Sequence, residues 1–191
     1  PARHGLIAAE RASTALAFER AADLYQVCIT LMEPAAVSGD LWYKYAISLA
    51  RCRRGKQAAG AFLSAAEHAT GDEALALRRV AAMHLLRSGE FERGEKLVEQ
   101  VLAAYGESIP ESDGQLIAAL AWERGRLALR GQRYTPRLEA AVPSELRERV
   151  DLFATLTVDT MAYDPLRAAL FQARCMRSAL TAADATSVAR A

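Results

Sequence analysis

The chain has 191 residues, enough for one elongated domain with a substantial core. Hydrophobic residues make up 52% of it and charged residues 25%, which excludes a disordered chain; the net charge of +1 gives no global attraction to nucleic acid or to an anionic membrane. Alanine, leucine, arginine and glutamate dominate and β-branched residues are sparse, which favours helices. We therefore expect an all-α protein.

The cysteines and the hydrophobic runs indicate where in the cell the protein is expected. Cys28, Cys52 and Cys175 are scattered and odd in number, so we expect no disulfide framework and a cytoplasmic location. Charged residues interrupt every apolar run, so we expect no membrane span. The chain starts at Pro1 and ends in helical-looking sequence, so we expect a fragment of a longer protein.

The first 106 residues predict three pairs of helices. A short helix is expected from Leu6 to about Thr14, followed by one with Phe18, Ala21, Tyr25, Cys28 and Met32 on one stripe. The central pair carries Trp42, Tyr45, Ala46 and Leu49 on its first helix, and Ala58, Phe62 and Ala65 on its second. In the third pair, one face of the first helix is expected to carry Leu77, Val80, Ala81 and His84. The buried side of the second is expected to carry Phe91, Gly94, Leu97, Val98, Val101, Leu102 and Tyr105.

The three pairs share one spacing. The small residues Ala21, Ala58 and Gly94 lie 37 and 36 residues apart. Four residues beyond each lie Tyr25, Phe62 and Val98. A small residue lets two helix backbones approach, and a bulky one a turn later fills the gap, so the interval predicts a repeat.

The pattern is less regular in residues 107–191. A helix is expected over 115–130 with Leu116, Leu120 and Leu127 inward, then an irregular stretch over 131–143. Ser144 is expected to cap a helix that ends near residue 163 and aligns Leu146, Val150, Phe153, Thr157 and Met161. Asp164 and Pro165 predict the start of a helix over 166–180, and Asp184 the start of a final one.

Residues 6–106 resemble tetratricopeptide repeats, most closely in the copy that contains Trp42. The resemblance implies antiparallel helix pairs stacked in a right-handed superhelix. We expect three such pairs in residues 1–106 and, in residues 107–191, a less regular extension of the same solenoid.

A second resemblance covers about residues 67–174. It rests on the segments Leu86–Phe91, Ala121–Arg124, Asp164–Arg167 and Phe171–Arg174. These resemble the helical repeat region downstream of the kinase and ATPase modules in large bacterial serine/threonine protein kinases. The resemblance implies a non-catalytic regulatory or scaffolding segment of a signalling protein. The chain itself contains no Gly-rich phosphate loop and no catalytic-loop aspartate motif.

The residue types that usually form metal sites and active sites are dispersed along the sequence. His4, His68 and His84 have no cysteine at ligand spacing, so we expect no metal and no cofactor. Cys28 occupies a packing position. We interpret the carboxylate pairs Glu10 and Glu19, and Glu107 and Glu111, as solvated surface, and expect no enzyme activity from this segment.

The candidate partner-binding residues are Tyr43, Lys44, Trp122, Arg126 and Arg130. Tyr43 and Lys44 lie off the buried stripe of their helix. Trp122 has polar neighbours and is either a partner anchor or a packing residue. Arg126 and Arg130 belong to a basic tract of five arginines over 124–137, which suits an anionic partner or, more simply, a solvated face.

We expect a protein or peptide partner, no nucleic acid, and the option of a homodimer through exposed helix ends. Two alternatives to an interaction module stay open. One is the helical sensor domain of a bacterial transcription activator that binds a small effector between repeats, and the other is a helical enzyme.

Overall fold

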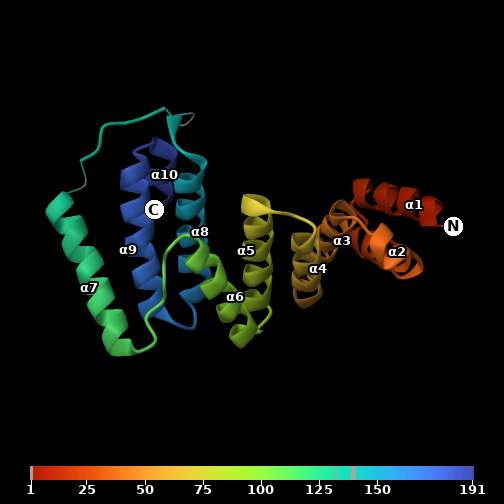
Figure 1. Ribbon diagram of the computed structural model, residues 1–191, viewed down its shortest axis with the longest axis horizontal. Helices are drawn as coiled ribbons and strands as arrows, with labels where there is room; N and C mark the ends of the chain where they lie inside the picture. Colours follow the sequence, from red (N-terminus) through yellow and green to blue (C-terminus); the bar gives the residue numbers. More distant parts are fainter. Residues whose placement is uncertain (1, 132, 139–140) are drawn as a thin grey trace. The chain divides into compact units, whose positions relative to one another are not determined.

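The computed structural model describes residues 2–131, 133–138 and 141–191, and it divides into two compact units, Pro1–Ala104 and Tyr105–Ala191 (Figure 1). Every regular element in the described residues is a helix, and none of those residues forms a strand. The predicted all-α class is therefore confirmed. Among the described helices, none combines the length and the apolar character that crossing a membrane requires.

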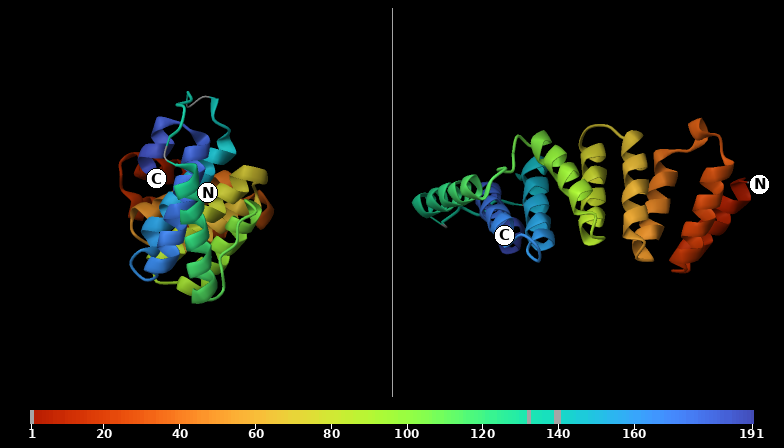
Figure 2. Two further views of the ribbon diagram at one scale, coloured as in Figure 1. Left: turned by 90° about the vertical axis from the view of Figure 1, so that its left-hand side faces the viewer. Right: turned by 90° about the horizontal axis from the view of Figure 1, so that it is seen from below.

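The N-terminal unit consists of three helical hairpins in chain order. Its helices are α1 (Ala2–Thr14), α2 (Phe18–Leu31), α3 (Gly39–Arg51), α4 (Gly55–Glu67), α5 (Gly71–Arg87) and α6 (Phe91–Ala104). A short 3₁₀ turn, η1 (Pro34–Ala36), connects α2 and α3. Each helix packs against its neighbours in sequence, and the spatial order of the helices follows the chain order (Figure 2). This is the arrangement of a helical repeat.

One turn geometry closes all three hairpins. The chain turns through a left-handed residue, with φ of 60°, 64° and 79° at Leu16, Arg53 and Gly89. The amide of the following residue donates to a carbonyl five positions earlier, at 2.9–3.0 Å, in the pairs Ala17 to Ala12, Arg54 to Leu49 and Glu90 to Leu85. These are the bonds of the Schellman motif, which satisfies the free carbonyls at a helix end. The turns recur at 37 and 36 residues, so the interval seen in the sequence is an interval in the structure.

The repeated side chains lie at the helix contacts. Buried side chains occupy the predicted large positions Tyr25, Phe62 and Val98, and Ala21 and Ala58 are fully buried. Gly94 is buried against Leu86. The prediction for Phe91 was wrong: it is the first residue of α6 and 45% exposed, because it precedes the face of α6 that packs on α5.

The close packing at Gly94 gives a first prediction. An added Cβ would lie 2.6 Å from Leu86 Cδ2 and 3.2 Å from the Leu86 backbone nitrogen. Gly94→Ala is therefore expected to lower the free energy of unfolding by about 1–3 kcal/mol through overpacking. Its matched control is Gly60→Ala in the middle of α4, where no atom lies within 4 Å of the added Cβ. Gly60→Ala is expected to raise the free energy of unfolding by about 0.5–1 kcal/mol, as alanine does in an open helix position.

Trp42 reports on this unit alone once Trp122, the only other tryptophan, is replaced by phenylalanine. Urea unfolding followed by Trp42 fluorescence therefore compares the two variants. Stabilisation by Gly94→Ala as large as that by Gly60→Ala would contradict the packing at this position.

The C-terminal unit is built around one central helix. It contains α7 (Asp113–Arg130), α8 (Ser144–Thr160), α9 (Pro165–Ala182) and α10 (Ala185–Arg190). Helices α7, α8 and α10 all pack against α9, and Figure 1 shows α9 between α7 and α8. As a result, α9 buries ten residues around much of its circumference, including Phe171 and Arg174.

Side-chain caps mark the helix starts. The carboxylates of Asp164 and Asp184 accept the amides of Arg167 and Ser187 at 2.9 and 2.8 Å, which confirms both predicted starts. Ser144 does not cap α8: it is the first helical residue, after Pro143, and the position before it makes no side-chain bond. Met161 lies just beyond α8 and is 52% exposed, so the prediction that it aligns with Val150 and Phe153 on that helix was wrong.

Candidate functional site

The N-terminal unit contains a groove of about 530 Å³ between α3, the end of α4 and the start of α5. Its lining is Gly39, Asp40, Tyr43, Ala65, His68, Ala69, Glu73, Ala76, Leu77 and Val80. Small side chains from α4 and α5 keep the groove open, and Tyr43, Leu77 and Val80 supply its bulky apolar surface. Its polar side chains are the two carboxylates, the imidazole and the Tyr43 hydroxyl.

Local chain geometry positions the groove. Ser38 caps α3 by accepting the Leu41 amide at 3.2 Å, which fixes where α3 starts. Gly39 lies against the end of α4, because a Cβ there would come within 2.8 Å of His68 Cβ. Gly71 has a φ of 57°, which turns the chain into α5 and places Glu73 in its first turn.

An aromatic stack supports the wall at Tyr43. The Tyr43 ring and the buried Phe62 ring pack in an edge-to-face manner with centroids 6.0 Å apart, and Phe62 stacks on His84 with centroids 5.6 Å apart. The three rings come from α3, α4 and α5, so the stack joins the helices that form the groove. Tyr43 is 45% exposed. Its ring is therefore held in place and still accessible from the groove.

Lys44, the neighbouring candidate, has its charge paired inside the unit. Its ammonium donates to Glu10 Oε1 at 2.9 Å and lies 3.0 Å from Asp40 Oδ2. These hydrogen bonds, that to Glu10 first, raise the pKa of Lys44. Asp40 thus shares its charge with Lys44, whereas Glu73 has no ion pair with any residue that the structure describes. The groove therefore keeps an unneutralised negative charge at Glu73.

The candidates on α7 lie in the other unit. Trp122 is 68% exposed, so it is a surface residue and not a packing residue. Arg126 is exposed. Arg130 donates from Nη2 to the Leu180 carbonyl at 2.7 Å, and it therefore ties the end of α7 to α9. Among the five candidates, Tyr43 alone lines the groove, and the two units are described separately.

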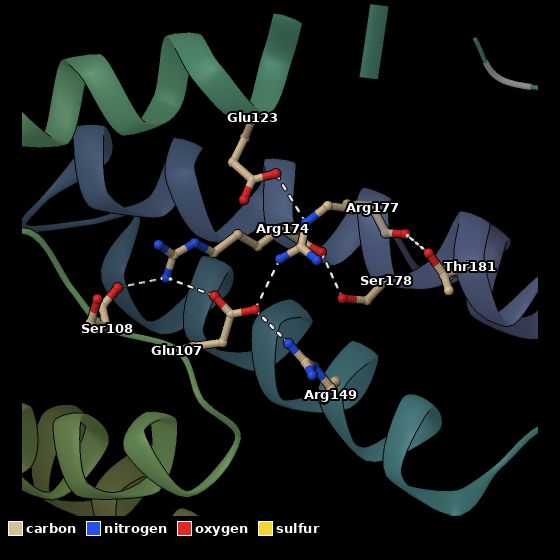
Figure 3. A network of polar contacts seen from close by, with 8 residues as sticks. All are labelled: Glu107, Ser108, Glu123, Arg149, Arg174, Arg177, Ser178 and Thr181. Atoms are coloured by element: carbon tan, nitrogen blue, oxygen red, sulfur yellow. Dashed lines mark hydrogen bonds and ion pairs between the residues drawn. The ribbon is translucent and has the colours of Figure 1, made fainter. Parts of the chain in front are cut away.

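A second polar cluster lies within the C-terminal unit (Figure 3). Glu107 Oε1 accepts hydrogen bonds from Arg149 and, at 2.9 Å, from Arg177, while its Oε2 lies 3.5 Å from Arg174 Nη1. Arg177 also donates from Nε to Glu123 Oε2 at 3.0 Å. We call these five residues the Glu107 cluster. It joins the segment before α7 to α7, α8 and α9.

The Glu107 cluster is buried, which corrects the interpretation of Glu107 as solvated surface. Its side chain is only 11% exposed, and that of Glu123 9%. Burial alone would raise the pKa of Glu107, but the hydrogen bond from Arg177 and the charges of the surrounding arginines outweigh it and hold the pKa below its usual value. Both oxygens of Glu107 and Oε2 of Glu123 face guanidinium groups, so the cluster is best explained as a structural ion-pair network.

The remaining histidines, cysteines and acidic residues do not come together in one site within the described residues. No group of three or more histidine, cysteine or acidic side chains in the described residues could hold a metal ion. Cys28 and Cys175 are buried, and burial raises the pKa of the Cys28 thiol, which disfavours the reactive thiolate. Among the histidines, His68 lines the groove and His84 supports it through Phe62.

Comparison with protein-family models, with curated proteins and with solved structures finds no match for this chain. The site therefore has to be interpreted from its own geometry.

Sequence reasoning missed Asp40, His68 and Glu73 as groove residues. Asp40 lies in the first turn of α3, and His68 and Glu73 lie on either side of a turn with no chemical motif. The one available signal was the pair of glycines, Gly39 and Gly71, which are the first residues of α3 and α5, the helices that form walls of the groove.

Proposed function

We propose that the chain is a non-catalytic protein–protein interaction module, and that the groove between α3, α4 and α5 receives a peptide segment of its partner. The observation that carries the proposal is an open groove lined by a supported tyrosine, small side chains and two carboxylates. Helical repeats commonly bind through the surface that successive first helices line, and α3 and α5 are the first helices of their hairpins.

The chemistry of the groove defines the kind of peptide. Tyr43, Leu77 and Val80 offer apolar contact, and Asp40 and Glu73 offer charge to a cation. A peptide with an apolar side chain next to a lysine or arginine would complement both features. The volume of about 530 Å³ has room for only a few side chains, so we expect a short linear segment.

The wider setting that we propose is a large bacterial signalling protein, specifically the helical region that follows the kinase module of a serine/threonine kinase. The resemblance of residues 67–174 to that region supports this setting. The reading frame that encodes the chain tests it: an upstream kinase domain would support the proposal, and its absence would contradict it.

The groove predicts a measurable binding preference. A displayed library of random peptides, selected on the full chain, is expected to enrich peptides with a basic residue beside an apolar one. Titration of the consensus peptide should show that Asp40→Asn with Glu73→Gln weakens binding about tenfold or more, because the peptide cation loses its partners. Tyr43→Ala should weaken it to a similar degree by removing the apolar wall.

The matched control is Glu99→Gln, which removes an exposed carboxylate on α6 outside the groove and should leave the affinity unchanged. Equal binding by the wild-type and groove variants would refute the assignment of the groove. Turnover of a substrate by this chain alone would refute the proposal of a non-catalytic module.

One observation favours a second candidate, the effector-binding sensor domain. The groove volume falls within the about 300–1,000 Å³ that is typical of small-molecule sites. A small amine that competes with the consensus peptide, and whose binding needs Asp40 and Glu73, would favour this function.

A further inference from the structure

Helix α7 has two apolar faces, and one of them is uncovered. At 100° per residue, the residues that face α9 centre on the buried Leu116 and Glu123. The opposite side carries an uncharged stripe, which we call the outer face of α7: Gly114, Ile117, Ala118, Ala121, Trp122, Gly125, Ala128 and Leu129. A helix with apolar residues on both sides is expected to be covered on both sides.

The outer face is open within the C-terminal unit. Ile117, Trp122 and Leu129 are 56%, 68% and 92% exposed. No atom lies within 4 Å of a Cβ built on Gly114 or Gly125. Three large apolar side chains therefore stand on one stripe with small residues between them. Exposed apolar stripes of this kind mark interaction surfaces.

The order of the residues on this face fits a second copy of itself running in the opposite direction. Along the chain the face starts with the small Gly114, has Trp122 near its middle and ends with the large Leu129. In an antiparallel pair, Leu129 of each copy faces Gly114 of the other. Each Trp122 then lies over Ala118 and Ala121, where the small side chains leave room for the indole.

The charged residues beside the outer face of α7 also favour antiparallel pairing. Glu111 lies just before α7 and Asp113 is its first residue, whereas Arg124 and Arg126 lie in its second half. Antiparallel pairing brings the acidic start of one helix toward the basic half of the other, and it also opposes the two helix dipoles favourably. Parallel pairing would instead place arginine beside arginine.

We infer that the outer face of α7 is a self-association surface, on which α7 of a second copy of this chain docks antiparallel. The surface is independent of the groove in the N-terminal unit. A single helix pair is small beside the about 1,200 Å² of a standard interface, so we expect a reversible dimer with a Kd on the order of 10–100 µM.

Sedimentation equilibrium of the full chain over a concentration series tests the inference. The wild type is expected to shift from monomer to dimer, and Trp122→Glu is expected to remain monomeric, because a charge would be buried at the centre of the pair. The matched control is Val158→Glu, which places the same charge at a 71% exposed apolar residue of α8 and should leave dimerisation unchanged. Circular dichroism confirms that each variant is folded.

Cysteine cross-linking tests the direction of the pair. In a Cys52→Ser background, which leaves only the two buried native cysteines, Gly114→Cys mixed with Leu129→Cys should form a disulfide between copies. Gly114→Cys alone should not form one. A wild type that stays monomeric throughout, a dimer that Trp122→Glu leaves intact, or cross-linking of Gly114→Cys with itself would each overturn the inference. The first of these results would reassign the outer face to a helix of a different protein.

Discussion

Glutamine in place of Glu107 is expected to lower the free energy of unfolding of the C-terminal unit by about 3–5 kcal/mol, the usual cost of leaving buried charges unpaired. The substitution keeps the size of the side chain but removes the negative charge that faces three arginines. Glu123 then remains as the only carboxylate of the Glu107 cluster, and it bonds Arg177. Arg149 then loses its ion-pair partner, and Arg174 keeps only the weaker attraction of Glu123, in a largely buried environment.

Trp122 is the reporter for this unit once Trp42 is replaced by phenylalanine. Urea unfolding followed by Trp122 fluorescence gives the loss for Glu107→Gln. The matched control is Glu111→Gln, an exposed residue of the same segment, which should change stability by less than about 0.5 kcal/mol. Adding Arg174→Met to Glu107→Gln should recover part of the loss, because it removes a buried unpaired charge.

The contribution of Glu107 should also depend on pH. Its pKa in the folded chain lies below the ordinary 4.5, so the unfolded chain binds the proton first as the pH falls. The stabilisation is therefore complete above pH 4.5 and is lost as the pH falls from there through the folded-state pKa. The difference between wild type and Glu107→Gln should be full at neutral pH and narrow in acid. A constant difference across this range would show that the charge is not the cause.

The hairpins of the N-terminal unit could be predicted from sequence because their packing follows local spacing. Ala21 and Ala58 come at a fixed distance before Tyr25 and Phe62, and a helix places such residues on one face whatever else the chain does. The starts at Asp164 and Asp184 were predictable for the same reason, since a cap depends on the next three residues only. The prediction that Phe91 is buried was wrong, because the periodicity does not show that this residue precedes the packed face of α6.

The Glu107 cluster could not be predicted, because its members come from four separate parts of the chain. Glu107 and Arg177 are 70 residues apart, and Arg177 and Glu123 are 54 apart. Their proximity depends on α9 lying between α7 and α8, which no local pattern specifies. Arg174 is only 7% exposed, although arginine is usually a surface residue. Without the helix order, a buried arginine and an exposed one have the same sequence signature.

The groove could be predicted from the sequence only in part. The sequence placed Tyr43 off the buried stripe, which is correct, because the helical period fixes the side of α3 on which it lies. The width of the groove depends on how α3, α4 and α5 are arranged, and the small side chains of Ala65, Ala69 and Ala76 line it. Such a distance is a property of three helices together, so Asp40 and Glu73 became candidates only in the structure.

Alanine in place of Phe62 is expected to lower the free energy of unfolding of the N-terminal unit by about 3–5 kcal/mol, the usual cost of truncating a buried phenylalanine. Phe62 is 1% exposed and is among the largest fully buried side chains. Its ring contacts Tyr43 of α3 and His84 of α5. The cavity left by alanine would therefore lie where three helices meet, and the backbone of three helices cannot easily close around it.

Phe91→Ala is the matched control, because it deletes the same ring in the same unit from a 45% exposed position and should cost much less. Phe62→Leu should restore most of the loss, since it refills most of the cavity. Fluorescence of Trp42 in the Trp122→Phe background measures all three variants. If Phe62→Ala and Phe91→Ala cost the same, the stack of Tyr43, Phe62 and His84 is not what joins the helices. The support of the groove would then have to come from elsewhere in the unit.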